Sequence, residues 1–445
     1  APRAPAASVH RAAAAGHSWL RRLPATPHAA TTVEPALLAC VRPPAVEYEP
    51  AIPRRLARAG ALSDLQLEAV LAIGRTHSTL LPAPASGGCA ASTSGSPSDG
   101  AAGCQGVRAG FLLADGPGVG KGRTQAAAIL DAWLHGHQRA VWVSASADLH
   151  ADAVRDLRAV CSATPGMPQL HKLVTPLSSV AASAPIPAPI GVVFSSYALL
   201  ARPARLAQLL AWCQGGGRRG GRQSGARPFE GVVCLDECHR AKAATATGMG
   251  TAVLRMQAEL PLGRLIYASA TAATELQNMA YLVRLGLWGP GTGFASFGAF
   301  RSEMTAAGPA AQELLPLHLK ATGRLVSRLI SFEGVPITVA THALSAAQRA
   351  EYDAAARFWL DLAAELRARA PRLPASATSR FWSAHQRFFR LLVTAAKLPT
   401  LFGAVDAALG SGKSVVVGLL GTGEAYAVPQ PPPQPAAAAA PVAAP

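Results

Sequence analysis

Short segments that are apolar almost throughout alternate with helix-like segments along this chain, and this alternation most constrains the fold. The helix-like segments have apolar residues at helical spacing, as in residues 124–136 and 147–160. Strands that are apolar on both faces and joined through helices indicate a parallel sheet covered by helices on both sides. The sequence therefore predicts an α/β fold, with strands at residues 110–114, 139–145, 190–200, 231–237 and 264–271.

The first of these strands leads into a glycine-rich turn and a helix, in the stretch FLLADGPGVGKGRTQAAAIL at residues 111–130. Such glycines let successive backbone N–H groups form an anion nest, and the positive end of the next helix faces the same point. Lys121 can reach the β- and γ-phosphates, whereas a dinucleotide-binding GxGxxG motif lacks its third glycine. We expect an ATP site at Gly116, Gly118, Gly120, Lys121, Gly122, Arg123 and Thr124.

The residue directly after the lysine is unusual. A phosphate loop normally has serine or threonine there, and its hydroxyl binds magnesium. This chain has Gly122, which offers no side chain. Thr124 is rotated by about 200° around the helix from that position, so we do not expect an equivalent ligand from it. The sequence leaves open how Mg²⁺ is held on this side of the site.

Two adjacent carboxylates, Asp236 and Glu237, end the strand at residues 231–237. Carboxylates at a buried strand end are costly unless a cation lies opposite, although two solvated acids at a strand end are also common. In phosphate-loop enzymes the first carboxylate holds magnesium and the second orients or deprotonates the attacking water. We expect Asp236 to be the Mg²⁺ ligand, and Lys121, Asp236 and Glu237 to be the catalytic residues.

Smaller motifs accompany these groups. His239 completes a D-E-C-H box, and Ser269 and Thr271 follow another strand, so their hydroxyls can hydrogen-bond the histidine and couple it to nucleotide state. Upstream, Gln66 resembles the glutamine that reads adenine in related enzymes, although a glutamine on a helix is usually only a polar residue. The order GxGK, DECH, SAT is typical of superfamily-two helicases and translocases.

The chain is strongly basic, with 41 Lys and Arg against 25 Asp and Glu and a formal net charge of +16. This balance favours polyanions such as DNA or chromatin as partners, although a compositional drift toward arginine can also produce it. No apolar stretch approaches the roughly 20 residues that cross a bilayer, so we expect no membrane partner.

The seven cysteines include no CxxC pair, which argues against a zinc site or a disulfide framework and fits a reducing compartment. The chain begins at Ala1, so we expect a processed protein or a piece of a longer one. Its first acidic residue is Glu34, and the preceding segment is rich in Ala, Arg and His. That composition offers an organelle transit peptide as the alternative to the edge of a longer protein.

Several strings together resemble the strawberry notch family: DGPGVGKGRT, VSASADLHADAVRDLRAV, LDECHRAK, YASATAATELQNMAYLVRLGLWGPGT and RFWSAHQRFFRLLVTAAK. The similarity extends from about Val33 to Ala425. It implies a RecA-like, helicase-like nuclear regulator of transcription that uses ATP and Mg²⁺ and contacts transcription factors or histones. In that family the GKGRT form of the loop is normal, so Gly122 does not by itself mark an inactive site.

The resemblance and the composition together predict the domain organisation. A disordered N-terminus at 1–32 precedes a RecA-like domain at 33–290 with insertions at 83–106 and 215–228. A mainly helical linking region at 291–397 follows, then the beginning of a second RecA-like domain, read as helix, turn and strand, at 398–426, and a disordered Pro/Ala tail at 427–445. Within the linking region we expect an amphipathic helix at 346–370, with Phe358, Trp359 and Leu362 in a core.

Two function classes remain. The first is an ATP-dependent motor or remodeller directed to nucleic acid, which the retained Lys121, Asp236 and Glu237 favour. The second is a nuclear scaffold that binds nucleotide but hydrolyses little. The arginine-bearing motif of a second RecA-like domain is absent from the sequence given, and this favours the scaffold. A soluble AAA-type assembly ATPase would require other motifs after the acidic strand.

Overall fold

A computed structural model describes residues 26–45, 47–82, 106–215, 228–242, 248–270, 276–369 and 376–419. The chain divides into two compact units, a first unit of Ala1–Glu333 and a second unit of Gly334–Pro445. Most of the predicted N-terminal segment, all but the end residues of the two predicted insertions, and the Pro/Ala tail lie outside the described residues.

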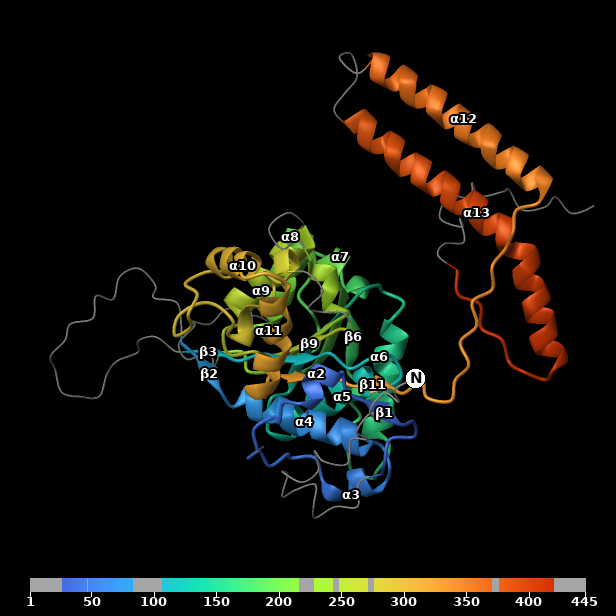
Figure 1. Ribbon diagram of the computed structural model, residues 1–445. Helices are drawn as coiled ribbons and strands as arrows, with labels where there is room; N and C mark the ends of the chain where they lie inside the picture. Colours follow the sequence, from blue (N-terminus) through green and yellow to red (C-terminus); the bar gives the residue numbers. More distant parts are fainter. Residues whose placement is uncertain are drawn as a thin grey trace, which may run out of the picture. The chain divides into compact units, whose positions relative to one another are not determined.

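Parallel strands form the central sheet of the first unit (Figure 1). Their order is β10-β4-β9-β8-β5-β7-β6. Every neighbouring pair in this sheet is parallel. The predicted strands correspond to five of these elements, which confirms the α/β fold class. The strands are β4 (Phe111–Leu113), β5 (Arg139–Ser144), β6 (Val174–Pro176), β7 (Gly191–Ser196), β8 (Val232–Asp236), β9 (Arg264–Ala268) and β10 (Leu325–Val326).

Helices cover both faces of the sheet, because side chains at alternate strand positions enter two separate cores. In β5, Ala140 and Trp142 pack in one core, whereas Val141 and Val143 pack in the other. The first face is covered by α3 (Arg54–Arg58), α4 (Asp64–His77), α5 (Lys121–Leu134) and α6 (His150–Cys161). The second is covered by α2 (Ala36–Ala39), α7 (Tyr197–Leu200), α8 (Pro203–Cys213), α9 (Gly248–Glu259), α10 (Phe297–Ala306) and α11 (Pro309–Ala321).

The strand predicted at residues 190–200 is shorter than expected. β7 ends at Ser196, and α7 begins at the next residue. The Ser196 hydroxyl accepts a hydrogen bond from the backbone N–H of Leu199 at 3.3 Å, which makes it the N-cap of α7. The apolar run therefore continues through a change of secondary structure that its hydrophobicity does not reveal.

The first unit extends beyond the predicted boundary at residue 290. β10 joins the sheet beside β4, with Leu325 opposite Leu112. β11 (Leu329–Ile330) then pairs antiparallel with β1 (Thr32–Val33), so distant segments close the same unit. A further antiparallel pair joins β2 (Leu80–Leu81) and β3 (Val107–Arg108). The predicted linking region at 291–397 is thus divided between the two units. The sequence does not reveal this boundary, because the strand pairings join residues far apart in the chain.

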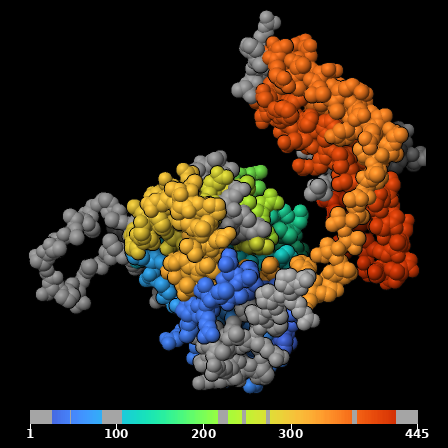
Figure 2. Space-filling model, in the orientation of Figure 1, coloured from blue at the N-terminus to red at the C-terminus, as the bar shows by residue number. Residues whose placement is uncertain are grey.

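The described part of the second unit consists of two long helices, α12 (Ala346–Arg369) and α13 (Ser376–Gly410). Figure 2 shows them side by side, and their contact includes the Trp359 ring at 5.3 Å from Phe381 and 5.7 Å from Phe388. The prediction of a helix here is confirmed. Phe358 and Leu362 are 61% and 40% exposed, so the prediction that they lie in a core is wrong for the described structure.

α13 differs from its prediction in two respects. The strand expected after the turn does not form within residues 413–419, where Val416 is 98% exposed, because a strand needs a neighbour for its backbone hydrogen bonds. By length and composition alone, α13 could also cross a membrane, contrary to the sequence expectation that no stretch approaches that size. Core helices of soluble proteins share this length and composition.

Candidate nucleotide site

The glycine-rich turn between β4 and α5 has the geometry of a phosphate loop. Gly118 and Gly120 adopt φ angles of +85° and +94°, a left-handed region that side chains disfavour. Gly120 is the N-cap of α5, so the free N–H groups of that helix face the turn. The Lys121 ammonium donates to the Asp115 carbonyl oxygen at 2.9 Å, beside the same turn.

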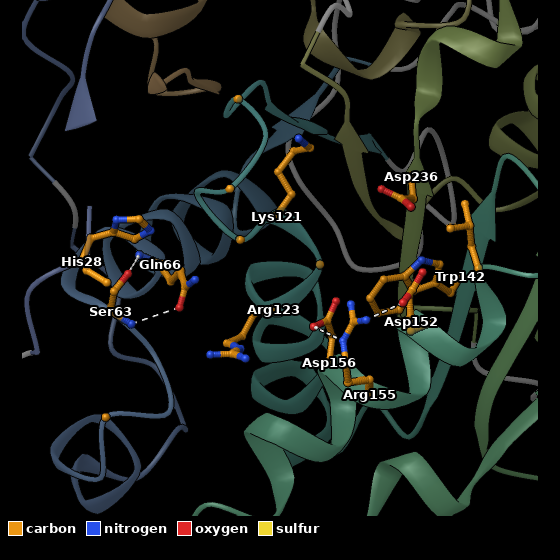
Figure 3. A pocket seen from close by; sticks show the side chains of 18 of the residues that line it. His28, Ser63, Gln66, Lys121, Arg123, Trp142, Asp152, Arg155, Asp156 and Asp236 are labelled. Atoms are coloured by element: carbon orange, nitrogen blue, oxygen red, sulfur yellow. Dashed lines mark hydrogen bonds and ion pairs between the residues drawn. The ribbon is translucent and has the colours of Figure 1, made fainter. Parts of the chain in front are cut away.

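A cavity of about 620 Å³ opens over this turn (Figure 3). It gathers groups from the phosphate loop, from α4 and α6, and from the end of β8, which lie far apart in sequence. Its lining includes the predicted residues Gln66, Gly116, Gly118, Gly120, Lys121, Gly122, Arg123, Asp236 and Glu237.

Thr124 is the predicted nucleotide contact that the structure does not place at this cavity. Its side chain is buried, and both of its donors bind the Gly120 carbonyl oxygen, the backbone N–H at 3.1 Å and the hydroxyl at 3.4 Å. Because of the helix rotation after Lys121, the hydroxyl contacts its own helix, and a contact between Thr124 and nucleotide stays a prediction.

Asp236 is held in place by neighbours from two elements. The Ser144 hydroxyl, at the end of β5, donates to its Oδ2 at 2.8 Å, and the Gln125 amide of α5 donates to its Oδ1 at 3.3 Å. The Gln125 side chain is fully buried, and its Oε1 has no hydrogen-bond partner among the described residues. A buried acceptor beside a fixed carboxylate suits a hydrated cation, so these residues fit Mg²⁺ with its water ligands.

Glu237 has an unusual backbone conformation. Its φ is +49°, and no other non-glycine residue in the described part of the chain has a positive φ. Its Oε2 lies 3.2 Å from His239 Nδ1, and the same nitrogen lies 3.0 Å from the Ser269 hydroxyl. The predicted hydrogen bond between His239 and Ser269 is therefore present, whereas Thr271 lies outside the described residues. Non-glycine residues in this region are strained and cluster at functional sites.

Gln66 already has partners in this structure. Its Oε1 accepts from the Ser63 backbone N–H at 3.0 Å, and its Nε2 donates to the Val119 carbonyl oxygen at 3.1 Å. The first bond is half of a capping box at the start of α4. The second ties α4 to the phosphate loop. Adenine recognition by Gln66 stays a prediction, and it would use the remaining hydrogen of the amide.

Asp156, on α6, is a cavity residue that the sequence did not single out. A Cβ atom built on Gly122 would overlap its Oδ2, so Asp156 occupies the space that a side chain at position 122 would fill. Burial raises the pKa of this carboxyl, Arg155 and Arg123 lower it, and the charges of Asp152 and then Asp236 add to the increase. The sequence places Asp156 on a helix but does not show which loop it faces.

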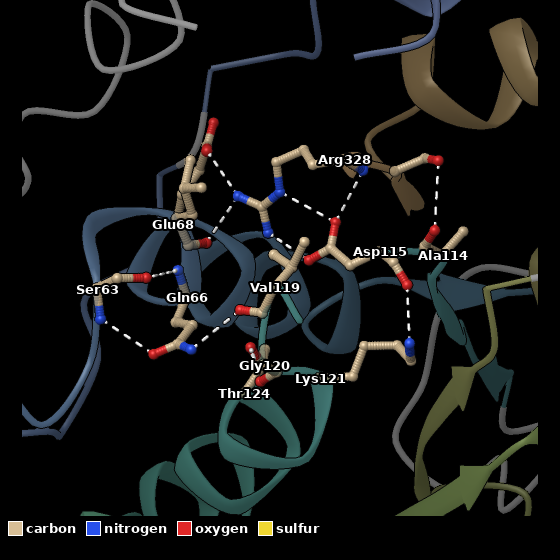
Figure 4. Close-up of polar contacts among 12 residues, drawn as sticks. Ser63, Gln66, Glu68, Ala114, Asp115, Val119, Gly120, Lys121, Thr124 and Arg328 are labelled. Atoms are coloured by element: carbon tan, nitrogen blue, oxygen red, sulfur yellow. Dashed lines mark hydrogen bonds and ion pairs between the residues drawn. The ribbon is translucent and has the colours of Figure 1, made fainter. Parts of the chain in front are cut away.

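A second group that the sequence did not single out, an arginine and two carboxylates, lies beside the loop (Figure 4). Arg328 donates to both carboxylate oxygens of Asp115, the residue two positions after β4, and also to Glu68 Oε2 at 3.1 Å. Burial alone would lower the pKa of Arg328, but the charge and hydrogen bonds of Asp115 outweigh it and raise that pKa. No local sequence signal marks this pair, because the strand that ends near Arg328 joins the sheet from a distant position.

The parallel sheet, the glycine loop at the start of α5 and the acidic end of β8 define a P-loop NTPase fold of the RecA-like, helicase-like kind. Comparison with known proteins agrees: the sequence model described as P-loop containing NTP hydrolase pore-1 matches residues 27–354. The chain belongs to this family and, within it, to the strawberry notch proteins.

Two curated relatives illustrate the relationship. Strawberry notch homolog 2 of Mus musculus is 38% identical over 410 residues, which cover 89% of this chain and 27% of the relative. Protein FORGETTER 1 of Arabidopsis thaliana is 37% identical over 416 residues, which cover 90% of this chain and 29% of the relative. The chain therefore spans less than a third of the length of these relatives.

Among solved structures, the SWI2/SNF2 ATPase core domain of Sulfolobus solfataricus has a TM-score of 0.32 and 15% identity. The match covers 57% of this chain and 47% of that chain. A similarity this low carries no argument about function.

Proposed function

We propose that this chain is the ATP-binding part of a helicase-like motor that regulates DNA-templated transcription through contact with DNA or chromatin. The observation that carries the proposal is the single cavity that brings together the phosphate loop, Asp236 and Glu237. These are the three groups that phosphate transfer requires: a phosphate cradle, a metal ligand and a group beside the attacking water.

Each group has a separate task in this proposal. The N–H groups of the loop and Lys121 hold the β- and γ-phosphates, while Ser144 and Gln125 fix Asp236 as a ligand of Mg²⁺. A bound Mg²⁺ would neutralise charge on the phosphates. Glu237 orients the water that attacks the γ-phosphate and accepts its proton. His239, between Glu237 and Ser269, couples this end of the site to the segment after β9.

The proposed partners rest on charge and family. A net charge of +16 supports attraction to the phosphate backbone of nucleic acid. Membership of the strawberry notch family supports a nuclear location and contact with transcription factors or histones. The acid-poor N-terminus supports an organelle as the alternative location.

Calorimetry with ATP and Mg²⁺ tests the nucleotide site of the 445-residue chain. Lys121→Ala should remove most of the affinity, because the phosphates lose the lysine that lies beside the loop. Lys172→Ala is the matched control, since Lys172 is exposed and outside the cavity. Equal ATP affinity in a folded Lys121→Ala variant and the wild type would show that the loop is not the nucleotide site.

Phosphate release, measured with and without DNA, separates the motor from the scaffold. DNA-stimulated turnover supports the motor. ATP binding with turnover at the background rate supports a nucleotide-binding scaffold instead.

A further inference from the structure

The position of Asp156 explains the glycine that follows the loop lysine. A Cβ on Gly122 would overlap Asp156 Oδ2, so the carboxylate occupies the space where a side chain at position 122 would begin. Figure 3 shows Asp156 of α6 beside the first turn of α5, with Asp236 across the same cavity. Position 122 thus supplies no side-chain oxygen, and a carboxylate oxygen from α6 lies directly beside it.

We propose that Asp156 replaces the missing hydroxyl and serves as a second carboxylate ligand of the nucleotide-bound Mg²⁺, opposite Asp236. This inference rests on the proposed function, because it assigns a residue to the metal of the proposed ATP site. Mg²⁺ prefers hard oxygen ligands and is commonly held by one or two carboxylates together with phosphate oxygens and waters.

The residues around Asp156 fit a metal ion whose remaining ligands come from the phosphates of ATP. No group of three or more His, Cys, Asp or Glu side chains could hold a metal within the described ranges, so protein ligands alone are too few. Asp156, Asp236 and the phosphates of ATP would together supply enough oxygens. The unpartnered Oε1 of the buried Gln125, whose amide nitrogen contacts Asp236, offers an acceptor for a metal-bound water.

An ordinary ion pair does not explain why the Asp156 carboxylate lies beside the phosphate loop. Its nearest cation is Arg155, with 3.8 Å between Arg155 Nε and Asp156 Oδ1. The Arg155 side chain is largely exposed and approaches Asp152 more closely, at 2.5 Å. A long pair with an exposed arginine contributes little, so it gives no reason to keep a carboxylate against the phosphate loop.

The test compares metal binding rather than turnover. Mn²⁺ replaces Mg²⁺, and electron paramagnetic resonance measures its affinity for the 445-residue chain saturated with a non-hydrolysable ATP analogue. We expect Asp156→Asn to weaken Mn²⁺ binding by about 10–100-fold, the range seen when groups that support a metal are lost. ATP affinity in EDTA should not fall. Asp152→Asn is the control, because it removes the same charge one turn earlier on α6.

A compensation experiment tests the replacement itself. Gly122→Ser alone should disturb the loop, because the new side chain meets Asp156. The double variant Gly122→Ser/Asp156→Ala restores an ordinary phosphate loop, and it should bind Mn²⁺ more tightly than Asp156→Ala alone. Thermal melting and circular dichroism confirm that each variant is folded before its affinity is compared.

The outcomes separate the two proposals. If the wild type does not bind the ATP analogue, the proposed function is wrong. If it binds the analogue with Mn²⁺ and Asp156→Asn keeps the wild-type metal affinity, only the role of Asp156 is wrong. Equal losses in Asp152→Asn and Asp156→Asn, or a double variant no better than Asp156→Ala, would also overturn it.

Discussion

Arg328 and Asp115, 213 residues apart in sequence, form a buried ion pair with two hydrogen bonds, Nη2 to Oδ2 at 2.7 Å and Nε to Oδ1 at 3.0 Å. Asp115 precedes the glycines of the phosphate loop, and Arg328 follows β10 at the end of the first unit. The same loop meets β11, because a Cβ on Gly116 would lie 2.7 Å from Leu329. The phosphate loop is therefore supported by the segment that leaves the nucleotide-binding unit.

Replacing Arg328 should destabilise the first unit strongly. Arg328→Ala leaves the Asp115 carboxylate buried without its cation, a change that typically costs about 3–5 kcal/mol of unfolding free energy. Arg328→Lys should recover only part of the loss, because lysine cannot make both hydrogen bonds in the fork geometry. Urea unfolding measures the difference.

The control for this prediction is Arg255→Ala, which breaks the exposed pair of Arg255 and Glu259 on α9. Exposed pairs contribute about 0–1 kcal/mol, so this variant should unfold close to the wild type. Similar losses in the two alanine variants would mean that the Asp115 pair does not stabilise the loop specifically.

This pair also marks the limit of what the sequence could predict. The strands, the helices and the loop of the ATP site have local signals, namely apolar periodicity and glycine spacing, and the structure contains them. The position of Arg328 depends on β10 joining the sheet beside β4, and that of Asp156 depends on how α6 crosses α5. Neither packing has a local signal, so these two residues could not be selected from the sequence.

The second unit shows a different limit. The helical pattern at 346–370 correctly predicted α12, but the same apolar spacing suggested that Phe358 and Leu362 are buried. Periodicity identifies the apolar face of a helix and does not identify what covers it. In the described residues α13 covers only part of that face, near Trp359.

Stability should fall in acid because of His77. Burial first, and then the charge of Arg264, lower the pKa of this histidine to about 3, although the Leu265 carbonyl oxygen acts in the opposite direction. The folded form keeps His77 neutral, while the unfolded chain protonates it below about pH 6.5. The stability from this group is therefore complete above pH 6.5 and is lost as the pH falls toward 3, at about 1.4 kcal/mol per pH unit.

Urea unfolding of the wild type and of His77→Gln, from pH 7 to pH 4, measures this effect. Glutamine can still donate to the Leu265 carbonyl but does not titrate, so the variant should lose less stability on acidification. Carboxylates contribute equally to both proteins and cancel in the comparison. Parallel stability curves for the two proteins would exclude His77 as the acid-sensitive group.

DNA binding should be electrostatic and tolerant of sequence. If the basic chain neutralises Z phosphates of duplex DNA, the logarithm of the association constant should fall with that of salt concentration by about 0.9 per phosphate. Fluorescence anisotropy with two unrelated duplexes of equal length gives this slope. An affinity that stays flat from low to physiological salt would rule out the net charge as the source of binding.

Glu237 should lower the stability of the fold through its backbone conformation while its side chain promotes ATP hydrolysis. Its φ of +49° costs a residue with a side chain about 1–2 kcal/mol, whereas glycine adopts this conformation freely. We expect Glu237→Gly to raise the unfolding free energy by about 1 kcal/mol. We expect both Glu237→Gly and Glu237→Gln to lose about 10²–10⁴-fold in ATP hydrolysis while still binding ATP, because the water loses its base and the phosphate loop is intact.

Urea unfolding, calorimetry with ATP and phosphate release separate the two effects of Glu237. Glu259→Gln is the control for a lost negative charge, since Glu259 is exposed on α9 and outside the cavity. A Glu237→Gly variant less stable than the wild type would mean that contacts of the side chain, such as that with His239, outweigh the backbone strain. If hydrolysis persisted in Glu237→Gln, another group would activate the water, and the strained backbone would need a different explanation.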